Sequence, residues 1–301
     1  MNSEQKRKNH RKPSWLNKKI TYTDQKQRVG ELLAGLGLNT VCRSARCPNL
    51  SECYSAGRAT FMILGKKCTR NCGFCSVEYL EHSARDGYYP EDEPERIKKA
   101  AANLGLRYVV ITSVTRDDLE DGGAGHFAQT IKTLKQCRRS PGVEVLTPDF
   151  QGKTWCIDIV ARQGPDVFNH NVETVPRLYS RIRPQAHYQR SIRFLQYISQ
   201  QYPDIFLKSG LMVGLGESRE EVVDVLKDLQ QAGCHAVTIG QYMRPSHANV
   251  PVARYVHPKT FGFYQHKARE LGFVFAACGP YVRSSYMAEQ GYLAVRRALS
   301  Q

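Results

Sequence analysis

Six of the ten cysteines in this sequence fall into two tight triplets, whose spacing is typical of metal ligands. One triplet, Cys68, Cys72 and Cys75, lies in KCTRNCGFC with C-x3-C-x2-C spacing, directly after an apolar run. The basic N-terminus lacks the apolar core of a secretory signal, so we expect these thiols to stay reduced and to ligate metal. A structural zinc site needs four protein ligands, and no obvious fourth lies nearby, whereas a four-iron cluster can take three thiolates and leave one iron open.

The other triplet, Cys42, Cys47 and Cys53, lies in TVCRSARCPNLSEC with C-x4-C-x5-C spacing and precedes the first apolar run. It is also one ligand short of a closed four-ligand site. The four remaining cysteines stand alone beside apolar or helical residues, where a cysteine usually packs in the core. They are Cys137, Cys156, Cys234 and Cys278.

Length and charge limit the class of protein. The chain has 301 residues, enough to bury a core in one large α/β domain or two small ones. No apolar run approaches the roughly 18 residues that a membrane span needs, so we expect no membrane partner. Because the N-terminus does not read as a secretory signal, we expect a cytoplasmic protein. The net charge is +15, and residues 1–19 supply +6 of it, from seven Lys or Arg against one Glu. Such a charge favours acidic partners, which include nucleic acid, acidic protein domains and polyanionic ligands.

Short apolar runs alternate with amphipathic segments over most of the chain. The apolar runs begin near residues 61, 107, 143, 166, 206, 236 and 273, and segments with a 3.6-residue period begin near 94, 126, 219 and 259. Such βα units with buried strands favour an α/β fold, a parallel TIM-type barrel or partial barrel, over an open sheet. We expect a basic tail and N-terminal extension over residues 1–58, the partial barrel over 59–278 and a C-terminal helical extension over 279–301.

Within the N-terminal extension, residues 24–39 have an amphipathic pattern that predicts a short helix ending at Gly35 or Gly37. In the barrel, chemistry belongs at the C-terminal ends of the strands. Polar residues stand at these ends: 67–75 after the first strand, 113–118 after the second, 170–173 after the fourth, 214–217 after the fifth and Gln241 after the sixth.

The C-x3-C-x2-C segment, with an aromatic residue before its third cysteine, resembles the signature of the radical S-adenosylmethionine (SAM) superfamily. The resemblance implies a [4Fe-4S] cluster held by Cys68, Cys72 and Cys75, with SAM on the open iron and reductive cleavage of SAM to a 5'-deoxyadenosyl radical. It also implies that loops such as DGGA and GLGE contact SAM. The expected SAM contacts are Phe74, Ser113, Asp121, Gly122, Gly123, Asn171, Glu173, Arg183 and Gly214.

Both triplets together narrow this resemblance to the lipoyl synthase family, whose VC-x4-CPN-x3-C segment matches residues 41–53. Further similar segments span about residues 12–290: KPSWL, ATF, ITSV-x-RDDL-x-DGGA, EVLTPDF, FNHN-x-ETV, GLGE, QY-x-x-PS and RSSY. The sequence departs from the family pattern at two positions. Thr115 stands where the family usually has Asp, and Asn249 stands where it usually has His.

The RSSY segment at residues 283–286 has two interpretations. Taken alone, its serines predict an N-cap that opens the last helix, because serine is favoured at that position. The family resemblance implies instead that Ser285 ligates a second, auxiliary [4Fe-4S] cluster through oxygen, together with Cys42, Cys47 and Cys53. Ser284 is the near alternative for the ligand and could serve as the cap.

The resemblance implies insertion of two sulfur atoms into an octanoyl group on a lipoyl carrier domain, with Cys68, Cys72, Cys75 and Ser285 as catalytic residues. Expected carriers are 2-oxoacid dehydrogenase E2 subunits and the glycine cleavage H protein. Ferredoxin or flavodoxin would supply electrons, and a repair protein would rebuild the spent cluster. An RNA-modifying radical SAM sulfur transferase is the alternative, but no RNA-binding module is visible, so we expect no nucleic-acid partner. A simple electron carrier would leave the barrel unexplained.

Overall fold

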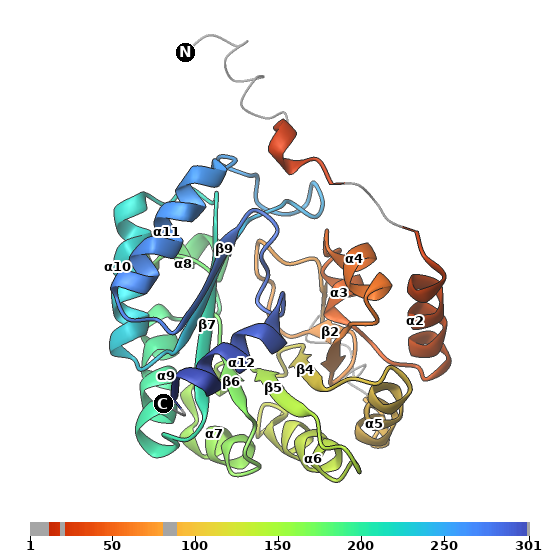
Figure 1. Cartoon of the computed structure of the whole chain (residues 1–301). Helices are drawn as coiled ribbons and strands as arrows, with labels where there is room; N and C mark the ends of the chain where they lie inside the picture. Colours follow the sequence, from red (N-terminus) through yellow and green to blue (C-terminus); the bar gives the residue numbers. More distant parts are fainter. Residues whose placement is uncertain (1–11, 19–21, 81–88, 300–301) are drawn as a thin grey trace.

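A seven-stranded parallel sheet forms the centre of the computed structural model, which describes residues 12–18, 22–80 and 89–299 (Figure 1). Residues 1–11 of the expected basic tail lie outside these ranges. The strands follow the chain in the order β1-β4-β5-β6-β7-β8-β9, and no pairing joins β1 to β9 in the described ranges. The sheet is therefore an open, partial barrel, as the sequence predicted. The strands are β1 (Thr60–Ile63), β4 (Tyr108–Ser113), β5 (Gly142–Leu146), β6 (Val167–Asn169), β7 (Phe206–Val213), β8 (Ala236–Gln241) and β9 (Phe275–Gly279).

Helices cover the outside of the sheet (Figure 1). The capping box at the start of one of them, in which Ser218 and Glu221 satisfy each other's backbone N–H groups, shows how the sequence sets a helix boundary. The outer helices are α5 (Glu93–Asn103), α6 (Ala124–Lys135), α7 (Thr154–Ala161), α9 (Tyr188–Gln201), α10 (Arg219–Gln231) and α11 (Pro258–Glu270). Short turns of helix are η2 (Phe150–Gly152), η3 (Pro176–Leu178) and α8 (Tyr179–Ile182).

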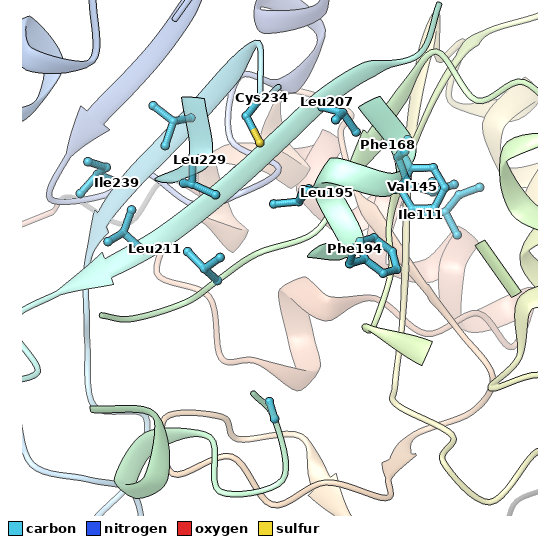
Figure 2. Close-up of a cluster of buried hydrophobic side chains, with 14 of the residues drawn as sticks. Ile111, Val145, Phe168, Phe194, Leu195, Leu207, Leu211, Leu229, Cys234 and Ile239 are labelled. Atoms are coloured by element: carbon cyan, nitrogen blue, oxygen red, sulfur yellow. The ribbon is translucent and has the colours of Figure 1, made fainter. Parts of the chain in front are cut away.

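The main core lies between the sheet and these outer helices (Figure 2). Ile111, Val145 and Phe168 come from three adjacent strands, and Phe194 and Leu195 come from α9. The rings of Phe168 and Phe194 meet edge to face with centroids 5.8 Å apart. Burying each such side chain contributes about 1.5–3 kcal/mol, so this layer fixes the strands whose ends carry the site.

The last helix, α12 (Ala288–Leu299), packs against residues at the N-terminal ends of the strands. Tyr292 of this helix stacks on Tyr108 of β4, with ring centroids 5.3 Å apart, and its hydroxyl donates to Asp166 at 3.0 Å. The C-terminal helical extension is thus present. The predicted serine N-cap is wrong, because the helix begins only at Ala288, after a turn over residues 284–287.

The segment before the barrel forms three helices, α2 (Asp24–Gly35), α3 (Val41–Ser44) and α4 (Leu50–Ser55), grouped on one side of the molecule (Figure 1). The first ends at Gly35, as predicted. A bridge between Thr40 and Phe61 joins this unit to β1. A single helical turn, η1 (Ser14–Leu16), precedes it, and the short parallel pair β2 (Lys67–Cys68) and β3 (Glu78–Tyr79) follows β1.

The isolated cysteines mostly pack in the core, as expected. Cys156 and Cys234 are buried, and Cys278 packs half-buried against the main core. Burial raises the pKa of the Cys156 thiol to about 11 and that of Cys278 to about 12. Each stands alone in the sequence and packs as a small apolar side chain, whereas a cluster needs several converging thiolates. Cys137 is half-buried, just after α6.

Candidate active site

The loop after β1 carries Cys68, Cys72 and Cys75, and the segment after β4 holds one side of it. The backbone N–H of Thr115 donates to the Cys68 sulfur at 3.3 Å. Thr69 donates from its N–H and from its hydroxyl to the Thr115 carbonyl, both at 3.0 Å. Thr115 therefore acts through its backbone, which explains why its departure from the family pattern leaves the loop in place.

A buried network of ion pairs also holds the same loop. Arg70 is 5% exposed and donates to Asp117 at 2.6 and 2.9 Å and to Asp149 at 2.6 Å. Arg190 pairs with the other oxygen of Asp149 at 2.8 Å. Burial alone would raise the pKa of Asp149, but hydrogen bonding and charge from Arg70 hold it well below its usual range. Asp149 is therefore ionised at neutral pH, and its charge-assisted hydrogen bonds with Arg70 hold the cysteine loop in place.

The opposite side of the loop is held by residues 249 and 250. The Asn249 amide donates to the Cys75 carbonyl at 2.7 Å, and the Val250 N–H donates to the Gly73 carbonyl at 2.9 Å. A Cβ atom on Gly73 would lie 2.9 Å from Val250 Cγ1, so this close approach needs glycine. Asn249, the second departure from the family pattern, thus has a defined contact with the loop.

The thiols of this triplet are close enough to influence one another. Burial raises the pKa of Cys72 and raises that of Cys75 to about 12, and the neighbouring thiolates add to the effect. The charge of Arg183 opposes it at Cys72. Ionising these thiols needs a compensating cation, which iron provides on binding. In the described ranges, no three Cys, His, Asp or Glu side chains converge on a single metal ion, whereas each thiolate of a cluster binds a different iron.

Polar side chains from the ends of β4 and β6 lie beside this triplet. Asn171 donates to Glu173 at 3.1 Å, and Arg183 donates to the Asn171 carbonyl at 3.1 Å. Glu173 has a φ of 65°, unusual for a residue other than glycine, and burial raises its pKa. Ser113 Oγ and Arg183 Nε are buried without hydrogen-bond partners among the described residues. Such orphaned groups fit a polar ligand such as SAM.

In the DGGA and GLGE loops, the acidic side chain accepts hydrogen bonds from nearby backbone N–H groups. Asp121 accepts the N–H groups of Gly123 and Gly125, at 2.8 and 2.7 Å, and so caps the start of α6. Glu217 accepts from the N–H groups of residues 214, 215 and 216, at 2.7, 2.9 and 3.1 Å. A Cβ atom on Gly214 would lie 2.2 Å from the Gln241 amide nitrogen. SAM contacts at these loops, at Gly122 and at the half-buried Phe74 stay predictions.

In chain order, Cys42, Cys47 and Cys53 form the first triplet, and Cys68, Cys72 and Cys75 form the second. The first triplet and residues near the end of the chain line one cavity. Cys42 lies on α3, Cys53 lies on α4, and Cys47 lies between these helices. These three cysteines and Ser285 are among the residues that line a cavity of about 350 Å³. Burial raises the pKa of Cys53 to about 12, and the charges of Cys42 and Cys47 raise it further. Three soft sulfur donors and one oxygen donor therefore surround one space, a donor set that fits an iron-sulfur cluster.

The two serines of RSSY have different surroundings. The Ser284 hydroxyl accepts from the Asn169 amide at 2.8 Å and donates to Asn171 at 3.0 Å. Ser285 makes no side-chain hydrogen bond with any described residue and lines the cavity. Arg283, beside them, is half-buried, and desolvation lowers its pKa, while the charges of Cys47 and Glu173 oppose that shift. Arg283 therefore lies within electrostatic reach of both halves of the site.

The N-terminal segment 12–18 connects three distant motifs. Lys18 donates to Asn49 at 2.5 Å and pairs with Glu52 at 2.7 Å. Asn49 donates to the Tyr281 carbonyl at 2.7 Å, and the Tyr286 hydroxyl donates to Glu52 at 3.2 Å. The KPSWL, CPN and RSSY segments thus meet around the first triplet.

Sequence reasoning gave no role to several residues that this structure brings into the site. Arg70, Asp117 and Asp149 support the cysteine loop, and Asn169 holds Ser284. Their signal in the sequence was present, because RDDL and PDF come shortly after strands and FNHN spans the end of β6. Which charges would pair could not be read from spacing, since the partners lie tens of residues apart.

Comparisons with known proteins bear on this geometry. Residues 62–229 match the Radical SAM superfamily. The sequence is similar to the lipoyl synthase of Caldanaerobacter subterraneus subsp. tengcongensis, at 53% identity over 93% of this chain and 97% of that protein. The lipoyl synthase of Nitratidesulfovibrio vulgaris is 51% identical over 94% of this chain and 93% of its own. The chain belongs to the lipoyl synthase family.

Membership in the lipoyl synthase family confirms both resemblances drawn from the cysteine motifs and makes the chain a radical SAM enzyme, with SAM and iron-sulfur chemistry. Among solved structures, the [FeFe]-hydrogenase maturase HydG aligns with a TM-score of 0.57 over 98% of this chain and 70% of its own. At 14% identity, this likeness shows the fold alone. No helix in the described part of the chain is both long and apolar enough to cross a membrane.

Proposed function

We propose that this enzyme inserts two sulfur atoms into the octanoyl group of an octanoylated lipoyl carrier domain, giving protein-bound lipoyl. The cavity shared by the first cysteine triplet and Ser285 carries this proposal, because three thiols and one hydroxyl line one space, which is the donor set that a second cluster needs. Arg283 supports the proximity of the two, since its charge interacts with Cys47 on one side and Glu173 on the other.

The radical-generating half of the site is the loop of Cys68, Cys72 and Cys75. A [4Fe-4S] cluster on these thiolates supplies, when SAM occupies its open iron, the electron that releases a 5'-deoxyadenosyl radical. Ser113 and Arg183 are the residues best placed to orient SAM, because each has a buried polar atom that lacks a partner among the described residues. The surrounding chain fixes the loop and excludes water from the reaction.

The sulfur-supplying half of the site is the cavity of Cys42, Cys47, Cys53 and Ser285. The [4Fe-4S] cluster bound there is a substrate, because its sulfide is consumed. With the cluster on Cys68, Cys72 and Cys75, the chain holds two clusters. Ser285 is a better candidate ligand than Ser284, because the Ser284 hydroxyl already accepts one hydrogen bond and donates another. Ligation by an oxygen in place of the usual thiolate would make the iron at Ser285 the easiest to release as sulfide is consumed.

The stoichiometry of this reaction implies which partners the enzyme needs. Each of the two octanoyl C–H bonds loses one hydrogen atom, so two molecules of SAM and two electrons are used per lipoyl group. Ferredoxin or flavodoxin is the proposed donor, and a cluster-repair protein restores the spent cluster. The carrier is a 2-oxoacid dehydrogenase E2 subunit or a glycine cleavage H protein in the cytoplasm, and the net charge of +15 supports docking of an acidic domain.

Isotopic labelling tests the function. The enzyme is reconstituted with heavy-isotope sulfide, then mixed anaerobically with SAM, reductant, an octanoylated carrier domain and light sulfide. Mass spectrometry of the carrier should find two heavy sulfur atoms, and turnover should stop near one product per chain. A Cys47→Ala variant is the matched control and should cleave SAM without forming lipoyl. Light sulfur in the product, or many turnovers without a repair protein, would rule out the sacrificial cluster.

A further inference from the structure

The hydroxyl of Ser284 lies at the end of β6, between two asparagines of the FNHN segment. It accepts a hydrogen bond from the Asn169 amide at 2.8 Å and donates one to Asn171 at 3.0 Å. The single proton of this hydroxyl is therefore used in the hydrogen bond to Asn171. The residues joined are more than 100 positions apart in the chain, so these two bonds fasten the end of the chain to the barrel.

The asparagine that anchors Ser284 from the barrel side is itself held by a buried polar network. Asn169 donates to Glu144 at 3.0 Å, and Glu144 accepts from Lys208 at 2.9 Å and from the Tyr108 hydroxyl at 3.0 Å. Asn169, Glu144 and Lys208 are each less than 5% exposed. A satisfied network of this kind is rigid, so it gives Ser284 a fixed point of attachment.

The other asparagine leads toward the SAM site. Asn171 donates to Glu173 at 3.1 Å, and its carbonyl accepts from Arg183 at 3.1 Å. Arg183 and Glu173 both act electrostatically on Cys72. Ser284 therefore touches the polar groups next to the second triplet, while the residue after it lines the cavity of the first.

The segment that Ser284 fastens has little regular structure of its own. Residues 284–287 form a turn before α12, with the Tyr286 N–H donating to the Arg283 carbonyl at 2.9 Å and Met287 at a φ of 56°. Ser285 has no hydrogen bond from its side chain to any described residue. Its position over the cavity therefore depends on its neighbours in the chain.

We propose that Ser284 is a positioning residue, which holds Ser285 at the auxiliary-cluster cavity by anchoring the RSSY segment to Asn169 and Asn171. The inference rests on the proposed function, because it takes Ser285 as the oxygen ligand. Ser284 itself does not bind iron. Loss of both anchoring bonds should lower the occupancy of the ligating position by about thirtyfold, since each neutral hydrogen bond contributes about 1 kcal/mol.

The test uses the full-length chain with Cys68, Cys72 and Cys75 changed to Ala, so that only the auxiliary cluster forms. Four forms are compared in this background: the parent with both serines intact, Ser284→Ala, Ser285→Ala and the double variant Ser284→Ala/Ser285→Ala. After mild oxidation, the readout is the electron paramagnetic resonance signal of three-iron clusters, which reports loss of one iron. Circular dichroism verifies folding of each form.

Ser284→Ala should give a three-iron signal close to that of Ser285→Ala, although Ser285 is intact. The double variant should match Ser285→Ala alone, because Ser284 acts through Ser285, and two independent effects would add. Ser284→Thr, which keeps the hydroxyl, should restore the parent signal.

The outcomes separate the two claims. If Ser285→Ala leaves the parent signal unchanged, Ser285 is not the ligand, and that part of the proposed function fails. If Ser285→Ala raises the signal but Ser284→Ala does not, the positioning role is overturned and the ligand assignment stands. An additive double variant also overturns the positioning role, because it indicates a general structural effect.

Discussion

Arg70 and Asp117 form a two-point ion pair that joins the cysteine loop after β1 to the segment after β4. The guanidinium donates to both carboxylate oxygens, at 2.6 and 2.9 Å. The Arg70 side chain is 3% exposed and that of Asp117 is 24% exposed. Arg70 lies two residues after Cys68, and its backbone N–H donates to the Cys68 sulfur at 3.4 Å, so the ion pair helps to place the first thiol of that triplet.

We expect Asp117→Asn to destabilise the protein by about 2 kcal/mol and to lower the iron bound by the second triplet. The cost arises because Arg70 stays buried with one anionic partner fewer. Denaturant unfolding and iron counts measure the two effects. The matched control is Asp224→Asn, whose partner Lys227 is 52% exposed and whose own side chain is 67% exposed. Exposed pairs contribute less than about 1 kcal/mol, so equal effects of the two variants would contradict the prediction.

The two triplets should have separable functions. Cys72→Ala should abolish formation of deoxyadenosine and leave the cluster of the first triplet in place, so that iron falls to near half of the parent value. Cys47→Ala should lower iron similarly and keep SAM cleavage. Anaerobic reconstitution with iron counting and chromatography of deoxyadenosine checks both. SAM cleavage at the parent rate by Cys72→Ala would show that the open-iron cluster is held elsewhere.

The strands were the most predictable part of the fold. All seven apolar runs became strands of one parallel sheet, and the polar residues expected at their C-terminal ends lie there. Buried parallel strands have continuous apolar runs, which remain visible without knowledge of their neighbours. The start of α12 was less predictable, because serine favours an N-cap only when its side chain is free, and Ser284 is bonded to β6.

The site was predictable in its thiols and much less so in its polar contacts. Cysteine spacing is local, so both triplets were evident from the sequence. The SAM contacts expected of Asp121 and the GLGE loop stay predictions. In this structure Asp121 accepts N–H groups at the start of α6, and Glu217 accepts from the N–H groups of its own loop. Support by Arg70 and Asn249 depends on contacts 47 and 174 positions apart, which no local pattern encodes.

His170 gives the stability of the protein a specific pH dependence. The ring is buried, with Nδ1 donating to the Thr147 carbonyl at 2.9 Å and Nε2 accepting from the Ser191 hydroxyl at 2.9 Å. Burial, assisted by the charge of Arg183, lowers its pKa from 6.5 to about 4 although Asp149 opposes the shift. The folded state therefore binds fewer protons than the unfolded state between these two values.

The resulting stability is present above pH 6.5 and is lost as the pH falls through 4. Between pH 7 and pH 5 the loss from this group should be about 2 kcal/mol. His170→Gln removes the titration, so its unfolding free energy should change less over the same interval. Denaturant unfolding of the metal-free chain at both pH values measures the difference. Parallel pH profiles for parent and variant would show that His170 is not the source.

The segment 12–18 should protect the first triplet through one buried side chain. Leu16 is fully buried, whereas Trp15 beside it is 40% exposed and meets His257 edge to face, with ring centroids 5.1 Å apart. Lys18, two residues further on, contacts Asn49 and Glu52, which lie before and within the helix that carries Cys53. The docking of Leu16 therefore determines whether Lys18 can reach α4.

Leu16→Ala should cost about 2–4 kcal/mol of docking free energy and detach this segment, because the cavity left by a buried leucine is not refilled. In the metal-free chain, Cys53 should then react faster with an alkylating reagent, which peptide mass spectrometry resolves residue by residue. Trp15→Ala is the matched control, and its loss of one exposed ring contact should cost about 1 kcal/mol and change the alkylation rate little. Cys234, buried far along the chain in the main core, provides the internal reference for global unfolding. If Cys53 and Cys234 accelerate together, Leu16 stabilises the whole fold and has no particular role at the first triplet.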